Sequence, residues 1–292
     1  MRALAKFILR GRIQAIAVAA LGLITLLPVS SAVVGLVSLA KGVKEGILVF
    51  LWISLLPLLT QQMGADNPLL VAVTIASLGI MVFAAAIHGL LASWQWSLVA
   101  IMVFAALCVM AFSLLMGSYV DALVTALQAM LLEIAQQQDV EISMTLSAPL
   151  VLGVLATVLF FGSVMGLILA RWWQALLYNP GGFQKEFHSF ALDAKLAVLL
   201  ILITVFVLSL PTDYLLWVYL VVFPLLLAGI ALAHHAVKQL NLGDQWLAFL
   251  YVALIMIGKP VTLILVGLGL ADSIFYLRSK LAEYKKIGRA HV

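Results

Sequence analysis

The stretch "LLVAVTIASLGIMVFAAAIHGLL", residues 69–91, decides the class of fold, because it contains no Asp, Glu, Lys or Arg. One bilayer crossing needs about 20 apolar residues in a helix. The apolar residues here follow one another continuously, whereas the wall of a membrane β-barrel alternates apolar and polar residues. We therefore predict that this stretch is a transmembrane α-helix.

The composition of the whole chain extends this interpretation. Of its 292 residues, 65% are hydrophobic and 10% are charged, and the mean hydropathy is +1.22. Such a chain has too few polar residues to cover a water-soluble domain. The sequence predicts one integral membrane domain over residues 1–292, an all-α, polytopic transmembrane helical bundle.

Further apolar runs cover residues 46–60, 96–116, 146–170, 192–210 and 214–233. Shorter runs are expected to form a hairpin near each end of the chain, with 13–27 and 31–40 around Pro28, and 246–257 and 261–275 around Pro260. We expect eight to ten membrane segments in total. We also expect residues 13–27 to be a retained first helix, although a basic start before an apolar run is typical of a signal peptide as well.

The basic residues predict the orientation of the chain. Cytoplasmic loops carry an excess of Lys and Arg. If the first two short runs form a hairpin, every Lys and Arg except Lys259 falls on one side of the membrane. We expect this side to be the cytoplasmic side of a bacterial inner membrane, with both termini there. Reading residues 13–40 as one span would reverse every later loop.

Two segments are expected to be amphipathic helices at the membrane surface. In residues 117–145 the apolar residues recur at helical spacing, with Gln128 away from the apolar stripe, so we expect a helix along the outer surface. Residues 276–292 are expected to form a basic cytoplasmic tail. There Leu277 and Leu281 line one face while Arg278 and Lys280 point to water, as is typical of a helix on an anionic leaflet.

Residues 171–191 are expected to form a cytoplasmic loop. Asn179, Pro180, Gly181 and Gly182 predict a sharp turn, and Phe183 begins a helical face that carries two further phenylalanines. The face is interpreted either as a juxtamembrane helix in the headgroup zone or as a docking site for a protein partner. These five residues are therefore candidates for a partner interface.

The stretches "YNPGGFQKEFHSFAL" (178–192) and "GLGLADSIFYLRSKL" (267–281) carry a resemblance to a known family. They resemble the YybS-like bacterial inner-membrane proteins, which have an Asn-Pro-Gly-Gly-Phe loop and a late Gly, Asp and Arg signature. The resemblance extends to the basic start and the order of the spans. It implies a compartment and no biochemical activity. The small-residue first helix and the bundle size are distantly similar to the substrate-binding subunits of energy-coupling-factor vitamin transporters.

Gly11, Ala15 and Ala19 recur every four residues, so one face of the first helix lacks bulk. In the vitamin-transporter subunits a similar alanine spacing contacts the coupling subunit. That resemblance implies a partner interface on this face, and packing inside the bundle is the alternative.

Three ionisable residues in apolar surroundings are candidate ligand contacts. Lys259 lies between two apolar runs. An ammonium group there is costly unless it pairs with a carboxylate, binds an anionic ligand, or extends to the lipid headgroups. His88 lies near the cytoplasmic end of its span and is interpreted as a ligand contact, a proton relay or a hydrogen-bonded structural residue. Asp272 ends an apolar run and needs a partner, yet Arg278 does not share its face at ideal helical spacing.

Other chemistries find no support in the sequence. It contains no Walker loop, no His-Glu-x-x-His and no nucleophile elbow. The adjacent His234 and His235 would point about 100° apart on a helix, and Cys108 is the single cysteine. We expect no catalytic residues, no metal and no cofactor. The basic residues adjoin apolar segments, so lipid headgroups rather than nucleic acid are the expected anionic partner.

The expected function is that of a substrate-binding or transport-type subunit. Its ligand would be a small or amphipathic molecule of unknown identity, bound between helices, and a membrane or cytoplasmic protein would supply energy. The alternative is a structural scaffold of the cell envelope that acts through protein–protein contacts. An enzyme acting on a lipid ranks third.

Overall fold

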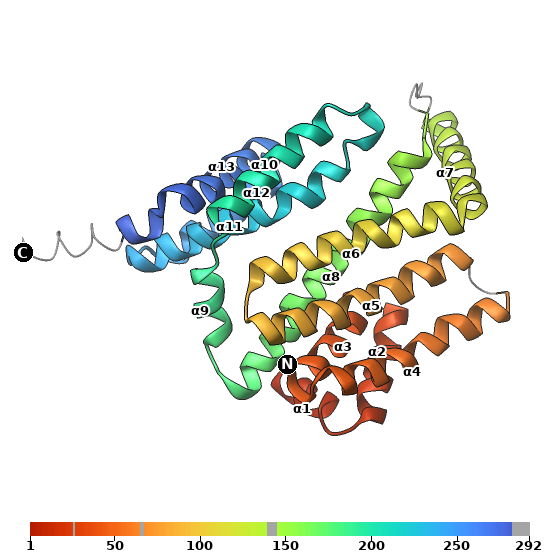
Figure 1. The fold of residues 1–292 in the computed structure, drawn as a ribbon, viewed down its shortest axis with the longest axis horizontal. Helices are drawn as coiled ribbons and strands as arrows, with labels where there is room; N and C mark the ends of the chain where they lie inside the picture. Colours follow the sequence, from red (N-terminus) through yellow and green to blue (C-terminus); the bar gives the residue numbers. More distant parts are fainter. Residues whose placement is uncertain (26, 65–66, 139–144, 282–292) are drawn as a thin grey trace, which may run out of the picture. The chain divides into compact units, whose positions relative to one another are not determined.

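The computed structural model describes residues 1–25, 27–64, 67–138 and 145–281 (Figure 1). Within these ranges the regular elements are helices and no strand occurs, so the prediction of an all-α chain is confirmed. The helices separate into two compact units. Unit 1 comprises residues 1–180 and 208–220, and unit 2 comprises residues 181–207 and the described residues from 221 onward.

Unit 1 contains eight α-helices and one 3-10 helix: α1 (Arg2–Ile8), α2 (Arg12–Thr25), α3 (Leu27–Lys41), α4 (Val43–Gln62), α5 (Pro68–Leu91), α6 (Trp94–Leu115), α7 (Gly117–Gln138), α8 (Ala148–Tyr178) and η1 (Thr212–Tyr214). Unit 2 contains α9 (Gly182–Ser189), most of α10 (Ala194–Leu208) and of α11 (Trp217–Gln239), α12 (Gln245–Met256) and α13 (Lys259–Phe275).

Six helices in the described ranges are long and apolar enough to cross a membrane, namely α4, α5, α6, α7, α8 and α11. The number rises to eight if α1 with α2 and α9 with α10, each bent sharply at a break, form one span apiece. These helices are consistent with a multi-pass membrane protein. The count of eight to ten is not confirmed, because short helices reach less far. At 1.5 Å per residue, α12 is only about 18 Å long, against a hydrocarbon core of about 30 Å.

Two of the long helices, α5 and α8, begin at a side-chain cap. α5 follows Asn67, whose side-chain oxygen accepts a hydrogen bond from the N–H of Leu69, with Pro68 in the first turn. Ser147 caps the start of α8 in the same way, with Pro149 in the first turn. The caps satisfy N–H groups that have no partner within the helix.

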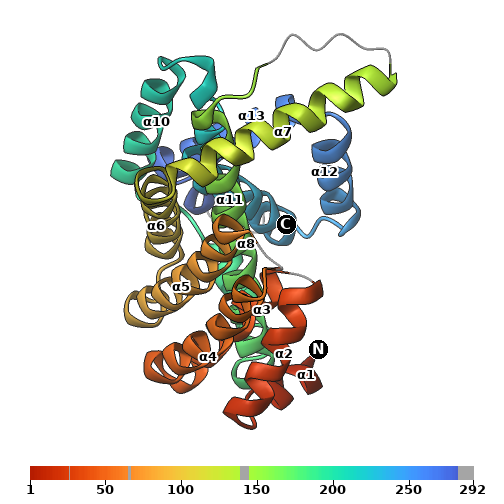
Figure 2. The same cartoon turned by 90° about the vertical axis from the view of Figure 1, so that its right-hand side faces the viewer.

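The core of unit 1 is α3, which packs against α2, α4, α5 and α8. Residues 31–38 of α3 are all buried, as expected for a helix that is apolar on every side. A Cβ added at Gly35 would collide with Met81 of α5 and Ala170 of α8, so the glycine sets the close approach of the three helices. Figure 2 shows α4, α5 and α6 beside one another in chain order.

The first two apolar runs do fold back on each other. The Ser30 hydroxyl of α3 donates to the Ala19 carbonyl of α2 at 2.8 Å, which fixes the crossing. Arg12 at the start of α2 donates two hydrogen bonds to the carboxylate of Glu45 at the start of α4, at 2.7 and 2.8 Å. Because α3 lies between them in the chain, this pair places the beginning of α2 and the beginning of α4 at the same end of unit 1.

Helix α7 has one half-buried face, on which Val120 and Ala135 are buried. Gln128 belongs to that face and not to the exposed one, since its side-chain oxygen accepts a hydrogen bond from the Leu146 N–H at 2.7 Å. The expectation that Gln128 points away from the packed side is therefore corrected. Figure 2 shows α7 crossing α8 at a large angle, not running parallel to it.

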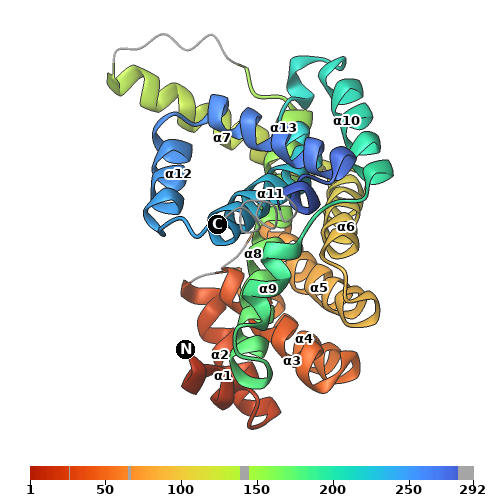
Figure 3. The same ribbon diagram turned by 90° about the vertical axis from the view of Figure 1, so that its left-hand side faces the viewer.

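Unit 2 is built on a close crossing of α11 and α13. A Cβ added at Gly229 would collide with the Leu265 carbonyl, and one added at Gly269 with the Leu225 carbonyl. Helices α12 and α13 contact each other near the joint between them, but Figure 3 shows them diverging at a large angle, so the expected hairpin of two side-by-side helices is not observed. Figure 3 shows α10 and α12 on opposite sides of α11. Polar residues near the end of α11 and just after α13 line one cavity, among them Lys238 and Arg278.

Candidate functional site

One polar site of unit 2 is an open cavity of about 410 Å³, here called the basic cavity. Helix α9 contributes Lys185, His188 and Ser189 to its wall, α11 contributes His235, Lys238 and Gln239, and the turn after α13 contributes Arg278. Lysine and arginine are always charged near pH 7, and none of these lining residues is acidic. The lining residues therefore carry positive charge, while the Asp272 carboxylate touches Arg278 and the half-buried Glu186 follows Lys185 on α9.

Helix α9 reaches this position because of the turn that precedes it. Helix α8 ends at Tyr178, and Gly181 adopts φ +82, which favours glycine. Asn179, Pro180 and Gly181 are exposed, Gly182 is buried, and Phe183 is half-buried. The Phe183 ring stacks on Phe187, with 6.4 Å between centroids. Within the expected partner interface, the exposed part is thus limited to the tip of the turn.

Arg278 reaches the cavity because α13 ends abruptly. Tyr276 adopts the left-handed conformation, with φ +51, and its N–H donates to the Asp272 carbonyl at 3.0 Å. The chain then folds back, so that the Arg278 N–H donates to Asp272 Oδ1 at 3.2 Å. Arg278 Nε lies 3.3 Å from Asp272 Oδ2.

Two expectations about this segment are corrected. Asp272 and Arg278 are partners, because the spacing rule for a continuous helix does not apply past Tyr276. Arg278 is also not in water, since its side chain is only 14% exposed, and that of Asp272 only 2%. Lys280 is exposed as expected. The remaining residues of the predicted tail, from 282 onward, lie outside the described residues.

The Arg278 guanidinium retains hydrogen-bonding capacity that the described protein does not use. Its Nη1 and Nη2 atoms are buried without a hydrogen-bond partner among the described residues, and so is Nε2 of His235. Burial lowers the pKa of Arg278 below its ordinary value, while the Asp272 carboxylate acts in the opposite direction. A buried, unpaired donor costs about 1–3 kcal/mol, and more when it is charged. The described residues supply no acceptor for these Arg278 and His235 nitrogens.

The histidines around the cavity point in different directions. His234 Nε2 lies 2.8 Å from the Tyr251 hydroxyl of α12, and its ring meets the edge of Phe187 at 5.3 Å, whereas His235 lines the basic cavity. Burial lowers the pKa of His188, and the nearby Lys238 acts in the same direction, followed by His234, His235 and Arg278. The described residues contain no group of three His, Cys, Asp or Glu side chains placed to hold a metal ion.

Helix α11, helix α13 and the residues that follow α13 line an apolar groove of about 460 Å³. Its walls are Leu232, Ala233 and Ala236 of α11, Leu268 of α13, and Leu277, Lys280 and Leu281. The basic cavity and the apolar groove have neighbouring walls, because His235 lines one and Ala236 the other, and likewise Arg278 and Leu277.

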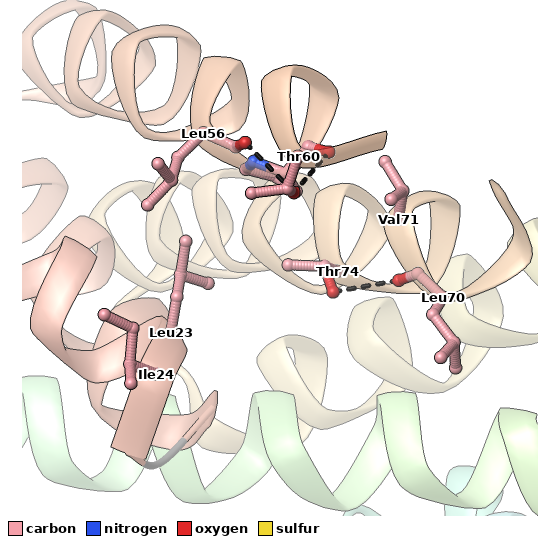
Figure 4. Close-up of a pocket in the computed structure, with 8 residues that line it drawn as sticks. Leu23, Ile24, Leu56, Thr60, Leu70, Val71 and Thr74 are labelled. Carbon is pink, nitrogen blue, oxygen red and sulfur yellow. Dashed lines mark hydrogen bonds between the residues drawn. The ribbon is translucent and has the colours of Figure 1, made fainter. Parts of the chain in front are cut away.

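Unit 1 has a separate cavity of about 260 Å³ between α2, α4 and α5 (Figure 4). Leu23 and Ile24 face Leu56 and Thr60 of α4 and residues of the first turns of α5. The Thr60 hydroxyl donates to the Pro57 carbonyl at 3.0 Å, and that of Thr74 donates to Leu70 at 2.9 Å. Both hydroxyls are thus engaged within their own helices. The lining contains no charged residue, so the cavity offers little to a polar ligand.

The three predicted ligand contacts lie in three different places. Lys259 is exposed at the first turn of α13, about 20 Å along that helix from Asp272 at 1.5 Å per residue. His88 is buried in unit 1, where its Nδ1 lies 3.1 Å from the Ser97 hydroxyl. That hydroxyl donates to the Ser93 carbonyl at 2.8 Å, so the arrangement suits His88 as the donor. Only Asp272 adjoins the basic cavity.

The small-residue face of the first helix is also placed by the structure. Gly11 lies outside α1 and α2, at their sharp bend. Ala15 and Ala19 are 1% and 0% exposed, and Ser30 of α3 bonds to the Ala19 carbonyl. This face packs against α3 inside unit 1, so a partner would have to displace α3 to reach it.

Sequence reasoning did not group the residues that form the basic cavity. Lys185, His188, Lys238 and Arg278 were assigned to one side of the membrane, and nothing in a single sequence indicates which of the many basic residues on that side meet. One signal was present: His235, Lys238 and Gln239 share a face of α11 at helical spacing.

Comparison with known proteins adds no identification, since no family model, no curated protein and no solved structure matches the chain.

Proposed function

We propose that this chain is a multi-pass membrane protein that binds an anionic, amphipathic ligand in the basic cavity of unit 2. It would serve as a substrate-binding or transport-type subunit and depend on a protein partner for energy. The observation that carries the proposal is Arg278, whose side chain lines the basic cavity and whose Nη1 and Nη2 atoms are buried without a hydrogen-bond partner among the described residues. An anionic acceptor would satisfy both donors at once.

The surroundings of Arg278 support an anion over a neutral or cationic ligand. Lys185 and Lys238 line the same cavity, and Asp272 is the carboxylate that pairs with Arg278. A cation would be repelled by this site. A neutral molecule would leave the guanidinium charge without compensation beyond Asp272.

We further propose that the basic cavity lies on the cytoplasmic side of a bacterial inner membrane, with both termini there. The ion pair of Arg12 with Glu45 and the bond from Gln174 to the Leu39 carbonyl support this orientation for unit 1. They gather the basic starts of α2 and α4 and the end of α8 at one end of the unit, as the positive-inside rule requires. A reporter fused after Val292 should be active only in the cytoplasm; activity on the other side would overturn the orientation.

Binding is tested with alkyl probes that differ only in their head group. The purified full chain in a neutral detergent is titrated with dodecanoate, dodecyl phosphate and dodecylammonium, and bound ligand is counted by native mass spectrometry. The two anions are expected to bind and the cation is not. Arg278→Gln should weaken anion binding by about tenfold or more, since a hydrogen bond to a charged group contributes about 1.5–3 kcal/mol.

The matched control is Lys195→Gln, which removes one positive charge from an exposed position on α10. It does not line the basic cavity, so anion binding should stay within about twofold of the unchanged chain. Equal binding of the anions and the cation, or equal loss in both variants, would contradict the proposed function.

A further inference from the structure

The basic cavity and the apolar groove have neighbouring walls on α11 and after α13. Consecutive residues line the two spaces at two places, His235 with Ala236 on α11 and Leu277 with Arg278 after α13. Consecutive Cα atoms are 3.8 Å apart, so the walls of the two spaces adjoin, although consecutive side chains on a helix point about 100° apart. A ligand with a charged end and an apolar end would reach both.

The charge of the basic cavity selects among anions. Arg278, Lys185 and Lys238 carry three positive charges, and the Asp272 carboxylate that touches Arg278 offsets one of them. Two positive charges remain when the histidines are neutral. A phosphate monoester carries about −1.5 to −2 at pH 7, whereas a phosphate diester or a carboxylate carries only one negative charge. The monoester therefore matches the cavity best.

The geometry of the donors favours the same group. The Nη1 and Nη2 atoms of one guanidinium form a planar fork, which fits two oxygens of a phosphate. Nε lies 3.3 Å from Asp272 Oδ2 in an ion pair, and the two Nη atoms have neither an ion-pair nor a hydrogen-bond partner among the described residues. His235 Nε2, which also lacks a hydrogen-bond partner among the described residues, lines the same cavity and supplies an additional polar contact.

The apolar groove suits a hydrocarbon chain. All its described walls are aliphatic except for Lys280, which is exposed and whose Nζ lies 5.9 Å from the centroid of the Phe275 ring. Leu232 is 5% exposed, and Ala233 and Ala236 leave space because they are small. Apart from Lys280, the described lining residues offer no polar side chain to a hydrophilic ligand, so burying polar groups of a ligand there would be unfavourable.

We infer that the ligand is a lipid phosphate monoester, with its phosphate against Arg278 in the basic cavity and its hydrocarbon chain in the apolar groove. This inference rests on the proposed function and narrows its ligand to one chemical class. The phosphate could belong to a membrane lipid or to a free molecule, and the experiment separates these sources.

Binding of four compounds to the full chain in a neutral detergent distinguishes the classes. These are didecanoyl phosphatidic acid, didecanoyl phosphatidylglycerol, glycerol phosphate and inorganic phosphate. Phosphatidic acid is expected to bind about tenfold more tightly than phosphatidylglycerol, because it carries the additional negative charge. The two compounds without a chain should bind at least about a hundredfold more weakly than phosphatidic acid, because they leave the groove empty.

Variants test the two halves of the site separately. Arg278→Gln should weaken every phosphate compound, and Lys195→Gln should weaken none. Ala236→Trp fills the groove and should reduce phosphatidic acid binding about tenfold while leaving glycerol phosphate unchanged. Ala233→Leu, a smaller change in the same wall, should act in the same direction. It keeps the test valid if Ala236→Trp does not fold.

The outcomes are separable. If glycerol phosphate binds as tightly as phosphatidic acid and both groove variants are silent, the ligand is a free phosphate and the lipid inference falls. If phosphatidylglycerol equals phosphatidic acid, the selection of a monoester is wrong. In both cases the proposed function survives, provided that alkyl anions bind through Arg278. If no anionic compound binds, both proposals fall together.

Discussion

Separating Asp272 from Arg278 should reveal how strongly unit 2 depends on their ion pair. Asp272→Asn keeps an oxygen that accepts the Arg278 N–H but removes the negative charge. Arg278→Gln removes the positive charge and leaves a carboxylate that is 2% exposed. The double variant removes both charges. The three variants and the unchanged chain make a double-mutant cycle, which isolates the interaction between the two side chains.

The magnitude follows from distance and burial. Coulomb's law gives about 5 kcal/mol for opposite unit charges 3.3 Å apart at an effective dielectric constant of about 20. Desolvation of both groups offsets much of this attraction, but removal of one partner leaves the other charge buried and costs about 3–5 kcal/mol. We expect each single substitution to lower the free energy of unfolding by about 3 kcal/mol. The double substitution should cost no more than either one, a coupling energy of about 3 kcal/mol.

The assay is denaturation in mixed micelles, followed by tryptophan fluorescence. The exposed pair of Arg12 with Glu45 is the matched control, because its hydrogen bonds of 2.7 and 2.8 Å are shorter while its side chains are 57% and 30% exposed. Solvent screening should make its coupling energy the smaller of the two despite the closer contact. Additive effects of the two substitutions at Asp272 and Arg278, within about 0.5 kcal/mol, would show that Arg278 is solvated and refute the reasoning.

Three further outcomes follow from the packing and the charges. Ala19→Leu should destabilise the chain by about 1–3 kcal/mol in a detergent melting assay, because Ala19 is 0% exposed against α3, whereas Ala17→Leu at an exposed position of the same helix should be nearly silent. Gly229→Ala should lower the melting temperature, because its Cβ would collide with the backbone of α13, and Gly267→Ala, which meets open space, should leave it unchanged or raise it. Burial lowers the pKa of His188, so its contribution to stability is present above the unfolded pKa of about 6.5 and is lost as the pH falls. The melting temperature should therefore fall less between pH 8 and pH 5 in His188→Gln than in the unchanged chain.

The membrane-spanning elements were predictable because their cause is local. Continuous apolar runs bounded by Pro, Asn and Ser define α5 and α8 in the sequence, and the same residues cap these helices in the structure. The role of α3 was not predictable in the same way. A short apolar run looks alike whether it crosses a bilayer or fills the middle of a bundle, and only its neighbours decide that residues 31–38 are buried on all sides.

The candidate site was less predictable because its cause is tertiary. The pairing of Asp272 with Arg278 depends on one left-handed residue, Tyr276, which is neither glycine nor asparagine and gives no sequence signal. If the helix continued without that turn, Asp272 and Arg278, six residues apart, would lie on different faces of it. The meeting of α9 with α11 likewise depends on the path of the chain after Gly181. Of the residues at this site, only Asp272 was predicted as a ligand contact, and which side chains would meet there could not be predicted.

The buried position of Arg278 distinguishes a binding residue from a residue that only sets topology. Lys185 and Lys238 are exposed, and an exposed cation already satisfies the positive-inside rule by facing water or headgroups. Arg278 instead gives up most of its hydration, since it is 14% exposed and two of its nitrogens lack a hydrogen-bond partner among the described residues. Orientation in the membrane does not require this cost. An anion that enters the cavity would recover it, which is the physical reason to seek the ligand beside Arg278 and not beside the exposed Lys259.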